Sequence, residues 1–466
     1  MYLIVSIIIL IISFYLFKKA AGTLDIRQIN MCSFVFYMMF FFVFVGSIRL
    51  LYYYNDLFYY LYDTKEDTIF FGWLVVMYTF LMLPAGMILA QKIFKIKSMK
   101  FLLNKYGYTK IQEDQFGKYI KHVLFLFSLV SGITVIYIFY LLGSYNPLLN
   151  LMSGVTDYTL LYQQRKTTSS NLLDSRFLSN MVTQIASYSA VMFYVAYVYW
   201  RKTNKISDQL WFIGIGFFAI LNAVYSIAKG PIIYLILGFF LLHVMIKGKI
   251  KISHIVYIVF ISLFLTILLF IFFQGYLRDP EQYYESYAVF EVLYRSIEER
   301  VFVGQVVNYF NVLEIFPYLQ PYLWLSTTGQ IIHDIAGLTY FEDYGVILMS
   351  YVDPLGYEIG TAGHATTFFM GEAWANFGFL GILIAPFYVG FFIQTINIFF
   401  LKAPKTPIYL ASYVYITLNI PILTAFKGFY YPAWLFQYFV LISVLFIMAY
   451  ILNGSGVKNE NNPSSS

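Results

Sequence analysis

The stretch that begins GYLRDPEQYYESY (275–287) and ends GTAGHATTFFMGEAWANF (360–377) is polar, and long apolar runs lie on both sides of it. Residues 275–377 hold 13 of the 24 carboxylates in the chain but only three of its 30 lysines and arginines. Two of the five histidines also lie here. This segment is therefore unlike the rest of the chain, and it is where we expect any chemistry to take place.

The remainder of the chain is apolar enough to lie in a membrane. Hydrophobic residues make up 60% of the sequence and charged residues 12%, whereas a soluble domain has about 25% charged residues. The apolar runs are long enough to cross a bilayer as helices, which satisfy their own backbone hydrogen bonds in lipid. We predict an all-α polytopic membrane protein with about eleven transmembrane helices and a large extracytoplasmic, partly helical segment. The predicted spans are residues 2–17, 31–50, 69–91, 122–143, 179–200, 210–228, 231–246, 252–274, 378–400, 407–425 and 433–452.

Lysine and arginine are unequally divided between the two sides of these spans. The side that carries the loop after the first span has 20 of them, and the other side has 10. Because cytoplasmic loops carry the excess of basic residues, the N-terminus is expected outside and the C-terminus in the cytoplasm. The net charge of +6 is then a signal of orientation and does not indicate nucleic-acid binding.

This topology divides the chain into four parts. Residues 1–274 form a membrane domain with spans 1–8, and 275–377 form the large extracytoplasmic segment. Residues 378–452 carry spans 9–11 of the membrane domain, and 453–466 are a polar tail that we expect to be disordered in the cytoplasm. The single cysteine excludes an internal disulfide, no Cys/His spacing of a metal site occurs, and no phosphate-binding loop motif is present.

Two arginines of the polar segment differ in their local partners. Residues 285–316 read as a helix, and Arg295 has carboxylates three and four residues away on it, so local ion pairs can absorb its charge. Arg300 has no carboxylate at these spacings. An arginine among apolar and small residues needs a distant partner or an anionic ligand, and both remain open for Arg300.

Three further outward cations are candidates for binding an anion. Arg278 follows the eighth span and is either paired with Asp279 at the interface or directed at a lipid-linked anion. Arg165 lies on the outward loop 144–178. Lys229 lies in a tight turn between two spans, where we expect Gly230-Pro231 to break the helix. It is either a simple turn lysine or faces a water-filled cavity or an anion.

The end of the polar segment offers a histidine and a carboxylate. His364 and Glu372 are eight residues apart and would share one face if the stretch were helical. Either side chain is of a type that can act as a general base. The alternatives are a structural histidine and an interfacial carboxylate paired with an arginine.

Several short stretches resemble the oligosaccharide repeat-unit polymerases, the Wzy or O-antigen polymerase family. They are GHATT (363–367), GEA (371–373), NFGFLG (376–381) and the turn SIAKG (226–230). The resemblance in architecture covers nearly the whole chain, with ten to twelve spans, large outward loops and outward arginines in apolar surroundings.

The resemblance implies a glycosyltransferase of the bacterial inner membrane that needs no cofactor and no metal. Such an enzyme moves a growing glycan from undecaprenyl pyrophosphate onto a new lipid-linked repeat unit at the outer face, and so builds a surface polysaccharide such as O-antigen or capsule. The expected partners are undecaprenyl-pyrophosphate-linked glycans, membrane lipid, and a chain-length regulator and flippase, with no nucleic acid.

The chemistry of this reaction suits the candidate residues. Guanidinium groups bind pyrophosphate bidentately and stay protonated at any working pH. A fixed cation stabilises the charge that develops on the leaving oxygen. We therefore assign catalytic roles to Arg300, Glu372 and His364, and pyrophosphate binding to Arg278, Arg165, Lys229 and Arg295.

Other functions remain open on the sequence alone. An O-antigen ligase would use a similar loop and arginines to transfer the glycan to the lipid A core. A flippase would move the lipid-linked unit without breaking bonds, but the long polar segment is untypical of that class. A scaffold membrane protein is a further alternative.

Overall fold

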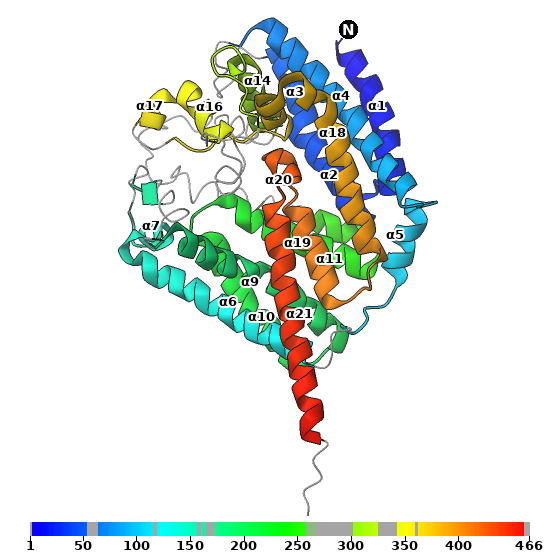
Figure 1. The fold of residues 1–466 in the computed structure, drawn as a ribbon, viewed down its shortest axis with the longest axis vertical. Helices are drawn as coiled ribbons and strands as arrows, with labels where there is room; N and C mark the ends of the chain where they lie inside the picture. The colour runs from blue at the N-terminus through cyan, green and yellow to red at the C-terminus, as the bar shows by residue number, and fades with distance from the viewer. Residues whose placement is uncertain are drawn as a thin grey trace, which may run out of the picture. The chain divides into compact units, whose positions relative to one another are not determined.

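The structure, a computed structural model, describes most of the chain. The described residues are 2–53, 64–114, 119–155, 160–161, 163–164, 172–173, 175–257, 260, 264, 302–324, 343–358 and 362–460. Every regular element within these ranges is a helix (Figure 1). The prediction of an all-α protein is therefore confirmed for the part of the chain that the structure describes.

Nine of the described helices are long and apolar enough to cross a membrane. Each overlaps one of the predicted spans. Most ends agree within four residues, and the larger differences are at Gln28, Met370 and Lys427. The chain is thus a multi-pass membrane protein. The polar segment 275–377 is partly helical where it is described, with helices within 302–324 and 343–358 and the start of another at Met370.

Two predicted spans do not appear among the nine. Most of 252–274 lies outside the described residues. In 407–425 the helix α19 (Pro407–Leu418) ends early, because Pro421 lacks a backbone N–H and drives Ile420 into an extended conformation (φ −60°, ψ +120°). At 12 residues, α19 is too short on its own to cross a bilayer of about 30 Å.

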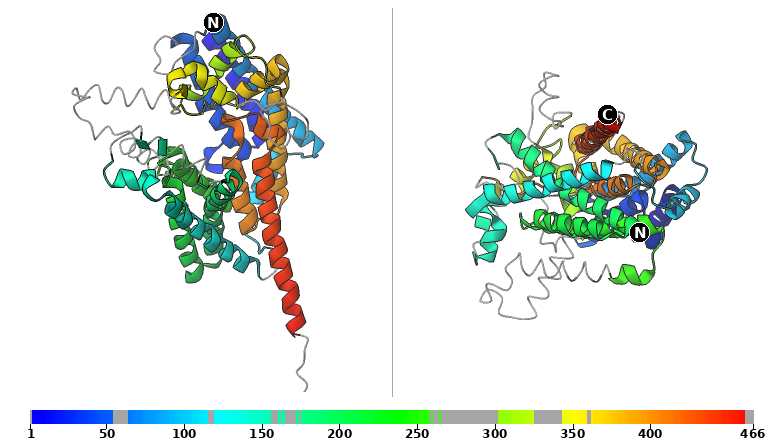
Figure 2. Two further views of the ribbon diagram at one scale, coloured as in Figure 1. Left: turned by 60° about the vertical axis from the view of Figure 1, so that its left-hand side comes forward. Right: turned by 90° about the horizontal axis from the view of Figure 1, so that it is seen from below.

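The chain forms two compact units, each made of segments far apart in the sequence. Unit 1 comprises Met1–Lys105, Glu281–Lys402 and Asn419–Ala433. Its longest helices, α4 and α18, run side by side in every view (Figures 1 and 2). The described parts of the polar segment belong to this unit. The helices of unit 1 are α1 (Tyr2–Ala21), α2 (Met31–Met39), the π-helix Phe40–Phe44, α3 (Val45–Tyr53), α4 (Glu66–Ile93), α5 (Met99–Tyr108, at its boundary), α14 (Gly304–Ile315), α16 (Tyr344–Val352), α17 (Pro354–Glu358), α18 (Met370–Lys402) and α20 (Lys427–Tyr430).

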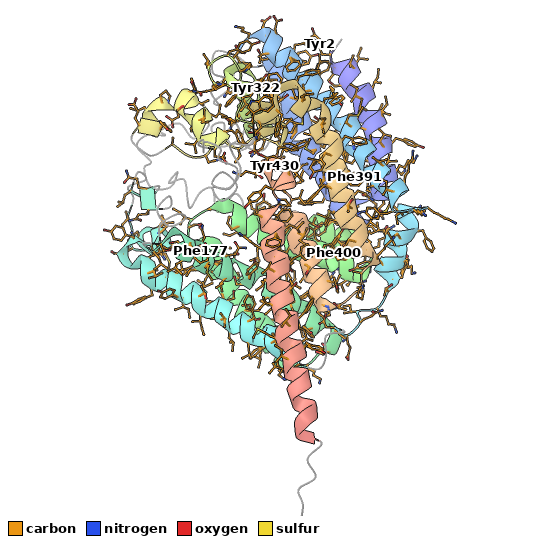
Figure 3. All side chains as sticks on the ribbon, in the orientation of Figure 1. Tyr2, Phe177, Tyr322, Phe391, Phe400 and Tyr430 are labelled. Atoms are coloured by element: carbon orange, nitrogen blue, oxygen red, sulfur yellow. The ribbon has the colours of Figure 1, made fainter. Side chains whose placement is uncertain are left out.

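The helix α18 is bent at Gly378, where φ is +56° and ψ is −135°. This backbone conformation is open to glycine and strained for other residues. The N–H groups of Leu323 and Trp324 donate to two backbone carbonyls just before the bend, at 2.8 and 3.0 Å. The ring of Tyr322 packs against the glycine, and Tyr430 contacts Asn376 in the same part of α18. Both tyrosines are labelled in Figure 3. The bend therefore separates a short first part of α18 from the long apolar part, which matches the predicted span 378–400.

Unit 2 comprises Tyr106–Pro280, Ala403–Leu418 and Trp434–Ser466. In it α9 packs against α6, α10 and α19 (Figure 1). The last helix, α21, continues past 452 to Glu460, into the segment expected to be a disordered tail. The helices of unit 2 are α6 (Ile120–Leu142), α7 (Pro147–Met152), α9 (Arg176–Thr203), α10 (Ile206–Val224), α11 (Lys229–Lys247), α19 (Pro407–Leu418) and α21 (Ala433–Glu460).

A buried lysine connects three segments of unit 2. The Nζ atom of Lys405 donates to the backbone carbonyls of Tyr106, Gly107 and Ile246 at 3.2, 3.0 and 3.1 Å. Burial lowers the pKa of Lys405 to about 8, so the group is still mainly an ammonium at neutral pH. Its three donors then match the three carbonyls.

The turn around Lys229 differs from the prediction in one respect. The connection between α10 and α11 is short, as expected, but Gly230-Pro231 does not break a helix. Both residues lie in the first turn of α11, where a proline is tolerated because its missing N–H would have no helical partner.

Candidate active site

The polar segment contributes a cluster of charged side chains to unit 1. Asp343 is the N-cap of α16, and its Oδ1 atom accepts the backbone N–H of Gly345 at 3.1 Å. Aspartate is favoured at this position because its side chain pairs with an N–H that has no helical partner. The cap fixes the carboxylate at the start of the helix and leaves it lone pairs for other partners.

Asp343 joins two further side chains. The Nε2 atom of His364 lies 2.7 Å from Oδ1, and the Nζ atom of Lys427 donates to Oδ2 at 2.8 Å. The side chain of Asp343 is 24% exposed, while those of His364 and Lys427 are 44% and 33% exposed. The carboxylate is therefore mostly shielded from solvent, whereas the imidazole and the ammonium are accessible to a ligand.

The ionised state of Asp343 decides which nitrogen of His364 carries the hydrogen in their hydrogen bond. Burial opposes ionisation of the carboxyl, but the hydrogen bond from His364 and the charge of Lys427 outweigh it and hold the pKa of Asp343 well below its ordinary value. An ionised carboxylate only accepts hydrogen bonds, so Nε2 of His364 carries the hydrogen. In the neutral ring, Nδ1 is then the atom with a free lone pair.

The Nδ1 edge of His364 lies over a glycine. A Cβ atom at Gly345 would lie 2.4 Å from Cε1 and 2.7 Å from Nδ1 of the ring. The ring of Tyr344 packs edge-on against the imidazole, with centroids 6.0 Å apart. Nδ1 has no hydrogen-bond partner among the residues that the structure describes. Asp343, Tyr344 and Gly345 thus fix the imidazole and leave Nδ1 able to take a proton.

Glu372 orders the opposite end of the cluster. It is fully buried in the first turn of α18, and its Oε2 atom accepts the backbone N–H of Lys427 at 2.6 Å. Lys427 is the first residue of α20, so the carboxylate caps that short helix. Glu372 therefore positions Lys427, and Lys427 in turn contacts Asp343.

A buried tyrosine ties the same segments together. The hydroxyl of Tyr344 donates to the carbonyl of Thr424 at 2.7 Å and accepts the backbone N–H of Thr367 at 3.3 Å. Burial, and then the charge of Glu372, raise the pKa of Tyr344, so the phenol stays protonated and remains a donor. These hydrogen bonds fix the positions of the segments that carry Asp343, His364 and Lys427 relative to one another.

The structure describes the side chains of two of the seven predicted site residues, His364 and Glu372. It brings both into one cluster, though not as a shared helical face, because residues 362–368 are not helical and α18 begins at Met370. A chain of contacts through Lys427 and Asp343 connects them instead. The predicted roles of the other five remain predictions, because Arg165, Arg278, Arg295, Arg300 and the side chain of Lys229 lie outside the description.

Two members of the cluster, Asp343 and Lys427, were not predicted from the sequence. Asp343 directly precedes the apolar run YGVILMSYV (344–352), which is a signal for a helix N-cap but not for a site. Lys427 is among the ten basic residues on the predicted outer side, and no role was predicted for it. A lysine within the apolar stretch TAFKGFYY (424–431) is costly without a partner, and that cost was the available signal.

The cluster has the components for proton transfer beside an anion. It combines an oriented imidazole, a partly exposed ammonium and two carboxylates that fix them. The described residues contain no group of three or more His, Cys, Asp or Glu side chains that could hold a metal ion. Compared with known proteins, the chain matches no protein-family model, no curated protein and no solved structure.

Proposed function

We propose that the protein is a glycosyltransferase that polymerises undecaprenyl-pyrophosphate-linked repeat units into a surface polysaccharide. The observation that carries this proposal is His364, whose Nε2 is held 2.7 Å from an ionised carboxylate and whose Nδ1 is left without a partner among the described residues. The multi-pass membrane architecture and the resemblance of 363–367 and 376–381 to the repeat-unit polymerases support it.

His364 acts as the general base in this proposal. Nδ1 takes the proton of the acceptor hydroxyl as that oxygen bonds to the sugar carbon of the donor. The bond from this carbon to the pyrophosphate breaks, and the pyrophosphate leaves on its lipid with the electron pair. Asp343 stabilises the imidazolium that forms, as a carboxylate does in a catalytic triad.

Cations hold the leaving group. Asp343 holds the ammonium of Lys427, which is 33% exposed and can contact a phosphate oxygen. Arg300, Arg278 and Arg165 add guanidinium groups that suit a pyrophosphate. Glu372 has a positioning role here, which differs from the base expected from sequence, because it is fully buried and bonded to the backbone of Lys427.

The orientation of the chain is part of the proposal. The excess of basic residues on one side supports an N-terminus in the periplasm and a C-terminus in the cytoplasm. Residues 275–377 would then face the periplasm of the inner membrane, where lipid-linked repeat units are the substrates of such a polymerase.

Deleting the gene in the bacterium that carries it tests the function. The expected result is that the surface polysaccharide, separated on a gel, collapses to a single repeat unit on the lipid A core. Loss of even that unit would contradict the polymerase and favour the ligase or the flippase. An unchanged ladder would contradict all three.

A further inference from the structure

A groove of about 660 Å³ lies between α6 and α10 of unit 2, which run beside each other (Figure 1). Its volume is within the range of about 300–1,000 Å³ that is usual for small-molecule sites. Both helices belong to the nine that are long and apolar enough to cross a membrane. The candidate active site lies in unit 1, so the groove is a separate feature.

One end of the groove is polar. Lys121 and His122 lie at the start of α6, and Ser207 and Asp208 lie at the start of α10. The N-termini of both helices therefore face this end, and each carries a partial positive charge. Asp208 is enclosed, with 2% of its side chain exposed, and pairs with Lys121, whose side chain is 35% exposed. The ammonium of Lys121 also lies over the ring of Tyr199, 5.5 Å from its centroid, and His122 is exposed at the mouth of the groove.

The rest of the groove is apolar. Phe125, Leu129, Leu210 and Phe218 line it, and the indole N–H of Trp211 on its floor is already bonded to Ser128. Gly214 lies in the wall, and a Cβ atom there would meet nothing within 4 Å. The groove thus has an apolar lining and one end that carries Lys121 and two helix N-termini. An amphiphile with an anionic headgroup fits this arrangement.

We propose that this groove binds one diacyl phospholipid with an anionic headgroup. Its phosphate contacts Lys121 and His122, and one acyl chain lies along Gly214. Leu129 and Leu210 are 45% and 62% exposed, as expected for side chains that face hydrocarbon. The excess of basic residues places this end on the cytoplasmic side, so the lipid comes from the inner leaflet.

Charge sets the headgroup preference. The added ammonium of a zwitterionic headgroup would lie among Lys121 and two helix N-termini, all of the same sign, and Asp208 is too enclosed to receive it. Phosphatidylglycerol should therefore bind more tightly than phosphatidylethanolamine with the same acyl chains.

The test is native mass spectrometry of the purified full-length protein, titrated with phosphatidylglycerol or phosphatidylethanolamine that carry identical acyl chains. Gly214→Phe fills the groove without changing any polar group, and Ile220→Phe adds the same ring at a 53% exposed position of α10 that does not line the groove. We expect phosphatidylglycerol binding to weaken about tenfold in Gly214→Phe and to stay unchanged in Ile220→Phe.

Two further comparisons make the result decisive. His122→Ala leaves the pair of Lys121 with Asp208 intact, and it should reduce the preference for phosphatidylglycerol over phosphatidylethanolamine. Equal binding of the two lipids by the native chain would overturn the proposal. Native-like binding of phosphatidylglycerol by Gly214→Phe would also overturn it. So would binding of inorganic phosphate as tight as that of phosphatidylglycerol, because either result would show that the apolar part of the groove does not contribute to binding.

Discussion

At the scale of single residues, the state of His364 depends on three neighbours that are consecutive in the chain. Asp343 takes the hydrogen of Nε2, Tyr344 packs against the ring, and Gly345 leaves room beside Nδ1. Because they are consecutive at the start of α16, one helix cap fixes all three contacts. A substitution at any of the three should therefore change the position or the hydrogen bond of the imidazole while the overall fold is retained.

Gly345→Ala tests the space beside the imidazole. The new Cβ would lie 2.4 Å from both Cε1 of His364 and the carbonyl oxygen of Ala365, so the ring and its segment must move. We expect a loss of stability of about 1–3 kcal/mol from overpacking and a fall in polymer formation of about 100-fold, as for a misplaced catalytic group. The control is Gly214→Ala, where a Cβ meets nothing. Normal chain lengths in Gly345→Ala would contradict the role given to Nδ1.

Asp343→Asn tests the ionised carboxylate through its pH dependence. The pKa of Asp343 is depressed in the folded protein, so the unfolded chain binds its proton first as the pH falls. This contribution to stability is complete above a pH of about 4, the ordinary aspartate pKa, and is lost as the pH falls further towards the folded value. The melting temperature in detergent should fall less between pH 5 and pH 3 in the variant than in the native protein. Identical slopes would show that the carboxylate is not held as described.

At the scale of helices, polar groups at the ends of elements carry the specific contacts. Glu372 caps α20, and the N–H groups of Leu323 and Trp324 satisfy carbonyls at the bend of α18. Backbone groups without partners are costly in an apolar protein, so these contacts determine where the helices end. Lys405 has the same function in unit 2, where it donates to three carbonyls.

Lys405→Met should destabilise unit 2, because three buried carbonyls lose a charged donor. We expect a loss of about 2–4 kcal/mol, measured by thermal unfolding in detergent. The native protein should also gain stability as the pH rises from about 8 to the ordinary lysine pKa of about 10.4, since the unfolded chain binds more protons in this window. The variant should lack this rise. Lys402→Met, at an exposed lysine nearby, is the control and should change neither quantity.

At the scale of the whole molecule, the spans were predictable because length and apolar composition alone determine them. Nine predicted spans correspond to helices long enough to cross a membrane. The end of α19 was missed because an apolar count does not weigh Pro421. The cluster could not be predicted, because Asp343 lies 21 residues from His364 and 84 from Lys427, and no local pattern relates residues so far apart. His364 and Glu372 were predicted from their residue types. Their different roles, His364 as the base and Glu372 as the residue that positions Lys427, follow from contacts that only the folded chain makes.

Cysteine labelling tests the orientation that the excess of basic residues predicts. The one native cysteine, Cys32, is fully buried and should not react, so the native chain is the control. Tyr318→Cys, at an 80% exposed position in the polar segment, should react with an impermeant maleimide added outside. Lys100→Cys, at an exposed position of α5, should react only after the membrane is opened. Labelling of both from the same side would refute the orientation.

The most direct measurement of the central claim is the length of the surface polysaccharide in a deletion strain that expresses His364→Ala or His364→Gln at native protein levels. Native protein should restore the full ladder. Both variants should give a single repeat unit, because neither side chain can take the proton of the acceptor hydroxyl. A full ladder from either variant, at normal protein levels, would contradict the assignment of His364 as the base of a lipid-linked glycan polymerase.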